Sequence, residues 1–176
     1  MSDWPGLPDP DDAAGRVIER YLGAYGPATP EVFDQWLLRG ATSRKTLRRW
    51  FAELGDRITL VDVGGRPGYL RTADLDELAD TEPHPVVRLL PGFDQYVLGP
   101  GTADPELIPS GYRAEVSRAA GWIAPVIVSN GRVCGTWRAE AGRPAPEFFE
   151  PAGQPGSGAE RKRLDAELDR VAALLD

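Results

Sequence analysis

The sequence has little of what several classes of protein need, with one cysteine, one histidine and two lysines among 176 residues. The single cysteine, Cys134, excludes an internal disulfide and gives no sign of secretion. One cysteine and one histidine leave no cluster of the kind that holds zinc, and we expect neither a metal nor a cofactor. The start, "MSDWPGLPDPDD", lacks the basic and apolar parts of a signal peptide, and no apolar run is long enough to span a bilayer. We therefore expect a cytoplasmic protein without membrane contact.

The charge of the chain is negative overall but unevenly distributed. The formal net charge is -7, and an apolar content of 41% can fill the core of one ordinary domain or of two small ones. Residues 39–52 carry a charge of +5, whereas residues 53–83 carry -5. The positive charge is concentrated in "TSRKTLRRWF", from Thr42 to Phe51. Overall acidity argues against indiscriminate binding of polyanions, so this stretch needs a local explanation.

Three stretches in the first half predict amphipathic helices, because their apolar residues recur at the spacing of one helix face. The first is "AAGRVIERYLGAY". The second is "TPEVFDQWLL", with Thr29 as its N-cap and Pro30 in the first helical position. The third follows a cap at Thr42 or Ser43 and ends at Gly55.

The pattern then changes to that of strands. The runs "RITLVDV" and "RPGYL" flank Gly64-Gly65, a pair that suits a tight hairpin turn. Three helices and a hairpin predict a winged helix over residues 13–82, preceded by a disordered segment over 1–12. In helix-turn-helix proteins the helix after the turn enters the major groove of DNA. The basic stretch falls on this predicted recognition helix.

The second half, residues 83–176, predicts a small antiparallel β-rich domain closed by a C-terminal helix. The predicted strands are "VVRLL", "QYVLG", "WIAPVIVSNGRVCGTW" and "APEFFEP", and Asn130-Gly131 is the strongest hairpin signal. The final helix presents one apolar face, made of Leu164, Leu168, Val171 and Leu175. The fold class is therefore α+β.

Four phrases carry a family resemblance: "RYLGAYGPATPEVFDQWL", "LGDRITLVDVGGRPGYL", "VVRLLPGFDQYVLG" and "GWIAPVIVSNGRVCGTWR". From about Ala14 to its end, the chain resembles the C-terminal half of the AlkZ/YcaQ-type winged-helix DNA glycosylase superfamily. The resemblance implies a winged helix followed by a β-rich domain, and enzymes that excise alkylated or crosslinked bases from DNA.

The chain departs from that family in two places. The catalytic signature of the family is Gln-x-Gln or Gln-x-Asp, and none of Gln35, Gln95 and Gln154 lies in such a pattern. After "YVLG" the family continues with an Arg-Asp-Arg type segment, whereas this chain has "PGTAD". The resemblance thus implies the architecture more directly than it implies glycosylase activity.

Candidates for catalysis are few. Asp94 in "PGFDQY" is the one carboxylate within a family-like phrase, and a role in capping a turn is the alternative. His84 lies between prolines in "EPHP", where an oriented general base is hard to hold. Cys134 lies in a strand and is interpreted as a buried structural thiol. Asp34 and Gln35 are interpreted as part of a solvated helix face.

The predicted interface with double-stranded DNA lies on the third helix and on the wing. Arg44 and Arg48 are four residues apart, as are Lys45 and Arg49, so each pair follows one line of the helix surface. The DNA-binding residues predicted from the sequence are Ser43, Arg44, Lys45, Arg48, Arg49 and Arg66. Arginines on the exposed face of a helix are also ordinary, which keeps a structural interpretation open.

Three functions remain open at this stage. We expect a DNA-binding protein associated with the nucleoid, assisted by a second copy or by another DNA-binding chain because the net charge is negative. The first alternative is a DNA glycosylase, or its C-terminal part, acting on alkylated or crosslinked bases. The second alternative is a protein-interaction module, since winged helices also bind proteins.

Overall fold

The computed structural model describes residues 6–149 and 156–175. The chain divides into two compact units, Met1–Thr81 and Glu82–Asp176. Among the described residues, no helix combines the length and the apolar character that crossing a bilayer requires.

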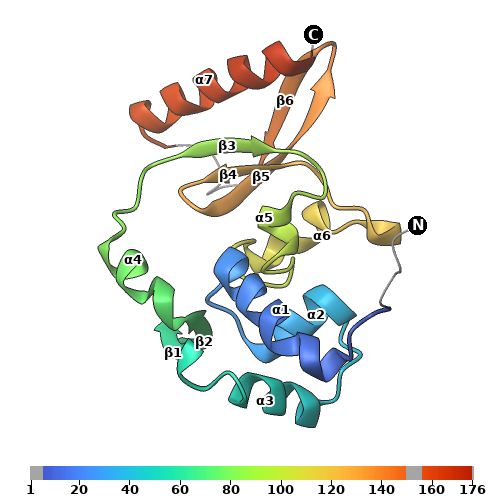
Figure 1. The fold of residues 1–176 in the computed structure, drawn as a ribbon. Coiled ribbons are helices and arrows are strands. Elements are labelled where there is room, and N and C mark those ends of the chain that lie inside the picture. The colour runs from blue at the N-terminus through green and yellow to red at the C-terminus, as the bar shows by residue number, and fades with distance from the viewer. Residues whose placement is uncertain (1–5, 150–155, 176) are drawn as a thin grey trace, which may run out of the picture. The chain divides into compact units, whose positions relative to one another are not determined.

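The first unit is a winged helix (Figure 1). It contains α1 (Pro10–Tyr25), α2 (Pro30–Leu38), α3 (Arg44–Ala52), the hairpin β1 (Ile58–Val63) and β2 (Arg66–Arg71), and α4 (Leu75–Asp80). Two short 3-10 turns join these elements, η1 (Gly55–Arg57) and η2 (Thr72–Asp74). The α+β class and the three helices followed by a hairpin agree with the sequence-based prediction.

Side-chain caps fix where the three main helices begin. The side chain of Asp9 accepts from the amide of Asp11 at 2.8 Å, that of Thr29 accepts from Val32 at 3.2 Å, and that of Ser43 accepts from Thr46 at 3.1 Å. Each bond satisfies an amide that the first turn of a helix leaves without a partner. Thr29 is thus confirmed as a cap, and Ser43, not Thr42, caps α3.

The core of the winged helix forms where the apolar faces of the three helices meet. Its buried members include Ile18, Tyr21, Leu22, Phe33, Leu47, Trp50, Phe51, Leu54 and Ile58. The ring of Phe33 lies 5.3 Å from Tyr21 and 6.0 Å from Phe51, edge to face in both pairs. This packing leaves the polar side of α3 exposed to solvent.

The second unit is an antiparallel sheet in the order β3-β4-β5-β6, and α7 (Gly158–Leu175) packs against β3 and β6 (Figure 1). Its strands are β3 (Val87–Leu90), β4 (Val126–Ser129), β5 (Arg132–Glu140) and β6 (Arg143–Phe148). Alternation along β4 sends Ile127 toward α7, whereas Val126 and Val128 join the core on the other face. The Asn130-Gly131 hairpin turn is present, with positive φ at both residues.

One predicted strand is wrong. The "QYVLG" segment forms the single helical turn α5 (Gln95–Leu98), which Asp94 caps. Between β3 and β4 the chain also forms η3 (Ser110–Tyr112), α6 (Arg113–Val116) and η4 (Ala119–Gly121), a region for which the sequence predicted no strand. The alternation of apolar residues in this segment is too short to distinguish a strand from a helical turn.

The predicted boundaries also shift. Helix α1 begins at Pro10, so residues 10–12, which were expected to be disordered, are helical because Asp9 caps them. Residues 1–5 of the same predicted segment lie outside the described residues. The division between the two units falls after Thr81.

Candidate nucleic-acid interface

The exposed side of α3 carries three basic side chains. Arg44 and Arg48 lie one turn apart, and Lys45 follows Arg44 in the first turn. Within residues 6–149 and 156–175, none of the three makes a hydrogen bond or an ion pair. Their charges are therefore exposed to solvent and are not compensated by a described residue.

Arg49, the fourth basic residue of the helix, has internal partners. Its Nη2 atom lies 2.6 Å from Oδ1 of Asp11, and its Nη1 atom lies 3.5 Å from Oε1 of Glu53. The indole Nε1 of Trp50 donates to the same Asp11 oxygen at 2.7 Å. Arg49 therefore joins α3 to the first turn of α1, and much of its charge is compensated within the protein.

The hydroxyl groups at the start of α3 contact each other. Ser43 accepts from the amide of Thr46, and the two hydroxyl oxygens lie 2.9 Å apart. The primary role of Ser43 in the structure is thus to cap α3, which fixes the direction in which Arg44 and Lys45 leave the helix.

The wing places Arg66 next to its tip. Gly64 and Gly65 have φ of 61° and 83°, the left-handed values that a two-residue hairpin turn of this kind requires. Arg66 is exposed and pairs with Val63 across the hairpin. The amide of Gly65 donates to Oδ1 of Asp62 at 2.8 Å, so a carboxylate accompanies the arginine near the tip.

The turn between α2 and α3 depends on a buried carboxylate. Asp34 is only 4% exposed, and its Oδ1 accepts from the amide of Thr42 at 3.2 Å. The expectation that Asp34 belongs to a solvated helix face is therefore wrong. The side chain of Asp34 instead faces the turn that follows α2. Its bond to the amide of Thr42 positions the start of α3.

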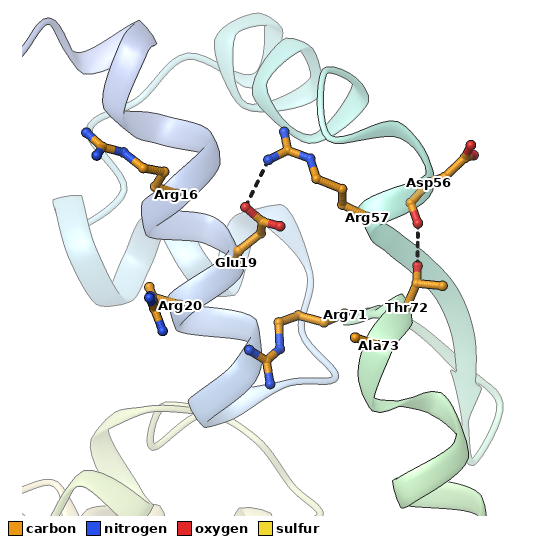
Figure 2. A pocket seen from close by; sticks show the side chains of 8 residues that line it. All are labelled: Arg16, Glu19, Arg20, Asp56, Arg57, Arg71, Thr72 and Ala73. Atoms are coloured by element: carbon orange, nitrogen blue, oxygen red, sulfur yellow. Dashed lines mark hydrogen bonds and ion pairs between the residues drawn. The ribbon is translucent and has the colours of Figure 1, made fainter.

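A second group of basic side chains lies outside the predicted interface. A pocket of about 580 Å³ has a lining that includes Arg16, Arg20, Arg57 and Arg71 (Figure 2). Sequence patterns do not reveal this group, because its members come from α1, η1 and the end of β2. The spacing of four between Arg16 and Arg20 was the one local signal.

The remaining candidates occupy structural positions. Asp94 accepts from the amide of Tyr96 at 2.8 Å as the cap of α5. Burial raises the pKa of Cys134 to about 11, which keeps it a thiol at neutral pH. His84 is exposed in the second unit, in the segment before β3. Among the described residues, no group of three or more potential ligands (His, Cys, Asp or Glu) is arranged to hold a metal ion.

Comparisons with known proteins agree on one family. The model described as "DNA glycosylase AlkZ-like" matches residues 1–174. The interstrand DNA cross-link repair glycosylase of Streptomyces sahachiroi is 54% identical over 136 residues, which make up 77% of this chain and 37% of that relative. Among solved structures, Streptomyces sahachiroi DNA glycosylase AlkZ matches with a TM-score of 0.87 and 45% identity, over 98% of this chain and 46% of that one. The chain spans less than half the length of both relatives.

Proposed function

The chain belongs to the AlkZ-like DNA glycosylase family, and on that premise we propose that it binds double-stranded DNA through α3 and the wing. The observation that carries the proposal is the exposed trio Arg44, Lys45 and Arg48 on the helix that follows the turn of a winged helix. In helix-turn-helix proteins this helix enters the major groove, where arginines reach phosphates and guanine edges.

The number of basic groups on this surface limits the strength of binding. The three basic groups of α3 and Arg66 on the wing neutralise about three to four phosphates, which gives a slope of log Kobs against log salt of about -3 to -4. Binding is then weak at physiological salt, and a second copy or another DNA-binding chain would strengthen it.

Glycosylase activity is the second candidate, because the relative with 54% identity is named as an interstrand DNA cross-link repair glycosylase. Excision needs a group that polarises water or stabilises the sugar cation. The chain has no Gln-x-Gln or Gln-x-Asp sequence, and Asp94 is engaged as a helix cap. We therefore place DNA binding first and excision second.

The test measures fluorescence anisotropy of a labelled duplex over a salt series, with unmodified and methylated duplexes in parallel. Arg44→Ala with Arg48→Ala is expected to make the slope shallower by about two. The matched control is Arg161→Ala with Lys162→Ala, which removes two exposed charges from α7. A slope in the α3 variant equal to that of the intact protein would remove α3 from the interface.

Heating the same samples with alkali afterwards reveals abasic sites. Uncleaved duplex together with salt-dependent binding supports a DNA-binding module. Cleavage of methylated duplex alone would favour the glycosylase, with Asp94→Asn as the next variant. Absence of DNA binding at low salt would leave the protein-interaction alternative.

A further inference from the structure

Four arginines line one pocket of the winged-helix unit. Arg16 and Arg20 come from α1, Arg57 from η1, and Arg71 from the end of β2 (Figure 2). They gather although the chain has a net charge of -7. The pocket is open to solvent, since the side chain of Arg57 is 53% exposed. A group attached to a larger molecule can therefore enter it.

Two of these arginines are held by carboxylates. Nη1 of Arg57 donates to Oε2 of Glu19 at 2.9 Å. Nε and Nη2 of Arg71 each lie 2.6 Å from an oxygen of Asp74, which forms a two-point contact. These bonds orient the guanidinium groups before any ligand arrives.

The other two arginines have no such partner. Arg16 and Arg20 are exposed one turn apart on α1, and neither guanidinium group forms a hydrogen bond or an ion pair in the part of the chain that the structure describes. The remaining acidic side chain of the lining, Asp56, directs its carboxylate away from α1 (Figure 2). Its backbone carbonyl instead accepts from Oγ1 of Thr72 at 2.7 Å. The α1 side of the pocket therefore keeps an excess of positive charge.

A glycine within α1 makes room for one of the held arginines. A Cβ atom at Gly23 would lie 2.5 Å from Cζ of Arg71, so the guanidinium rests directly against the helix backbone. Glycine inside a helix costs about 1 kcal/mol relative to alanine. Gly23 lies three residues after Arg20, on the same face of α1, so Arg71 packs on the face of α1 that carries Arg20.

The chemistry that fits this arrangement is a phosphate group. Guanidinium groups match phosphate oxygens with two parallel hydrogen bonds, and Arg16 and Arg20 have this capacity unused. We propose that the pocket between α1, η1 and the end of β2 binds a phosphate of the DNA backbone, as a second contact separate from α3 and the wing. The inference rests on the proposed function.

The test uses the full chain in the same anisotropy assay. Arg16→Ala with Arg20→Ala is expected to make the salt slope shallower by about one, because one phosphate contact is lost. The Arg161→Ala with Lys162→Ala variant controls for the change in net charge. Combining the α1 pair with Arg44→Ala and Arg48→Ala is expected to add the two effects, since the two surfaces share no residue.

Gly23→Ala tests the pocket without changing any charge. Alanine favours the helix, and the methyl group displaces the end of a flexible side chain, so the fold is expected to persist. Binding to the duplex is expected to weaken by roughly threefold through the displacement of Arg71. Circular dichroism confirms that the helix content is retained. An affinity equal to that of the intact protein would contradict the proposed pocket.

Inorganic phosphate, followed by amide NMR, distinguishes the two sources of the ligand. If phosphate shifts the amides of Thr72 and Ala73 while Arg16→Ala with Arg20→Ala leaves the DNA salt slope unchanged, the ligand is a free phosphate and a DNA contact is overturned. If neither measurement responds, the pocket does not bind phosphate. If the intact protein fails to bind the duplex, the proposed function is wrong. If duplex binding weakens in the Arg44→Ala with Arg48→Ala variant but not in the Arg16→Ala with Arg20→Ala variant, only the proposed phosphate pocket is wrong.

Discussion

The carboxylate of Asp11 lies 2.6 Å from Nη2 of Arg49, although 38 residues separate them in the sequence. The same oxygen accepts from the indole of Trp50 at 2.7 Å. These bonds tie the first turn of α1 to α3. They also compensate the charge of one of the four basic side chains of α3, the helix that we propose contacts DNA.

The first prediction concerns stability at acid pH. The hydrogen bond from Arg49, followed by that from Trp50, lowers the pKa of Asp11 below its ordinary value. A carboxylate whose pKa is lowered by folding stabilises the protein above its unfolded pKa, and this contribution is lost as the pH falls through the folded pKa. Asp11→Asn is therefore expected to lower Tm at neutral pH, and the difference from the intact protein should shrink as the pH falls below about 4.

Asp12→Asn is the matched control for this prediction. Asp12 is the exposed neighbour of Asp11, and its carboxylate forms no hydrogen bond or ion pair with a described residue. Thermal unfolding at several pH values should show a smaller effect for Asp12→Asn. Equal losses of Tm in the two variants would mean that the contact with Arg49 contributes nothing specific.

The second prediction concerns DNA binding by the same variant. Asp11→Asn releases Arg49 from its carboxylate partner on α1, so a fourth basic group of α3 becomes available to phosphates. The salt slope of duplex binding is expected to steepen by up to about one. A slope that steepens equally in Asp12→Asn would indicate a general effect of net charge rather than release of Arg49.

The third prediction concerns the contact between α7 and the edge of the sheet. Glu167 is 3% exposed, accepts from the amide of Leu89 at 3.0 Å and contacts Arg170 at 2.7 Å. Glu167→Ala leaves the amide of edge strand β3 without an acceptor, and should lower the free energy of unfolding by about 1–3 kcal/mol. Denaturant unfolding measures this loss, with Asp169→Ala on the exposed side of α7 as the control.

Low pH should reduce the contribution of Glu167 to the free energy of unfolding. The bond from Arg170 is the main cause that lowers the pKa of this carboxyl, and the amide of Leu89 adds to it. Its stabilisation is therefore complete above the ordinary glutamate pKa and disappears as the pH falls through the lowered value. The free energy of unfolding of Glu167→Gln should depend less on pH in this range than that of the intact protein. An unchanged dependence would mean that the Glu167 carboxylate does not contribute to acid sensitivity.

The fourth prediction tests the turn before α3. Asp34→Ala removes the buried acceptor of the Thr42 amide and is expected to cost about 1–3 kcal/mol of stability. Asp34→Asn keeps an acceptor oxygen and should lose less. Because the turn positions α3, Asp34→Ala should also weaken duplex binding at a temperature where the variant stays folded. Native DNA affinity in that variant would show that the turn does not control α3.

The fifth prediction concerns thiol reactivity. With a pKa of about 11, Cys134 is expected to react with a disulfide reagent at pH 8 roughly 100-fold more slowly than it does in the unfolded chain. Absorbance of the released thiolate, measured with and without guanidinium chloride, gives the two rates. Similar rates would mean that the thiol is accessible in the folded protein.

The winged helix could be predicted from local patterns because each of its elements carries its own signals. Thr29 followed by Pro30 marks the start of α2, and the Gly64-Gly65 pair marks the turn of the wing. The basic surface of α3 was also predictable, since positions four apart on a helix share a face. The segment between β3 and β4 was less predictable because its turns contain only a few residues each.

Local sequence patterns could not predict which partners the charged side chains have. Local patterns place Arg44, Arg48 and Arg49 on one helix. They do not show that Asp11 compensates the charge of Arg49 and leaves those of Arg44 and Arg48 uncompensated. The burial of Asp34 likewise depends on where the turn after α2 brings the amide of Thr42. Each of these contacts joins residues whose distance in space is set by packing of the core.

The sequence by itself therefore determined the order of the elements, the α+β class and the location of the basic helix, because capping, periodicity and turn preferences act over a few residues. Only the tertiary structure decided which charges remain available. Packing of α1 against α3 pairs Asp11 with Arg49, and the return of β2 toward α1 brings Arg71 against Gly23. Electrostatic compensation acts over a few ångströms in space, and separation along the chain does not reveal it.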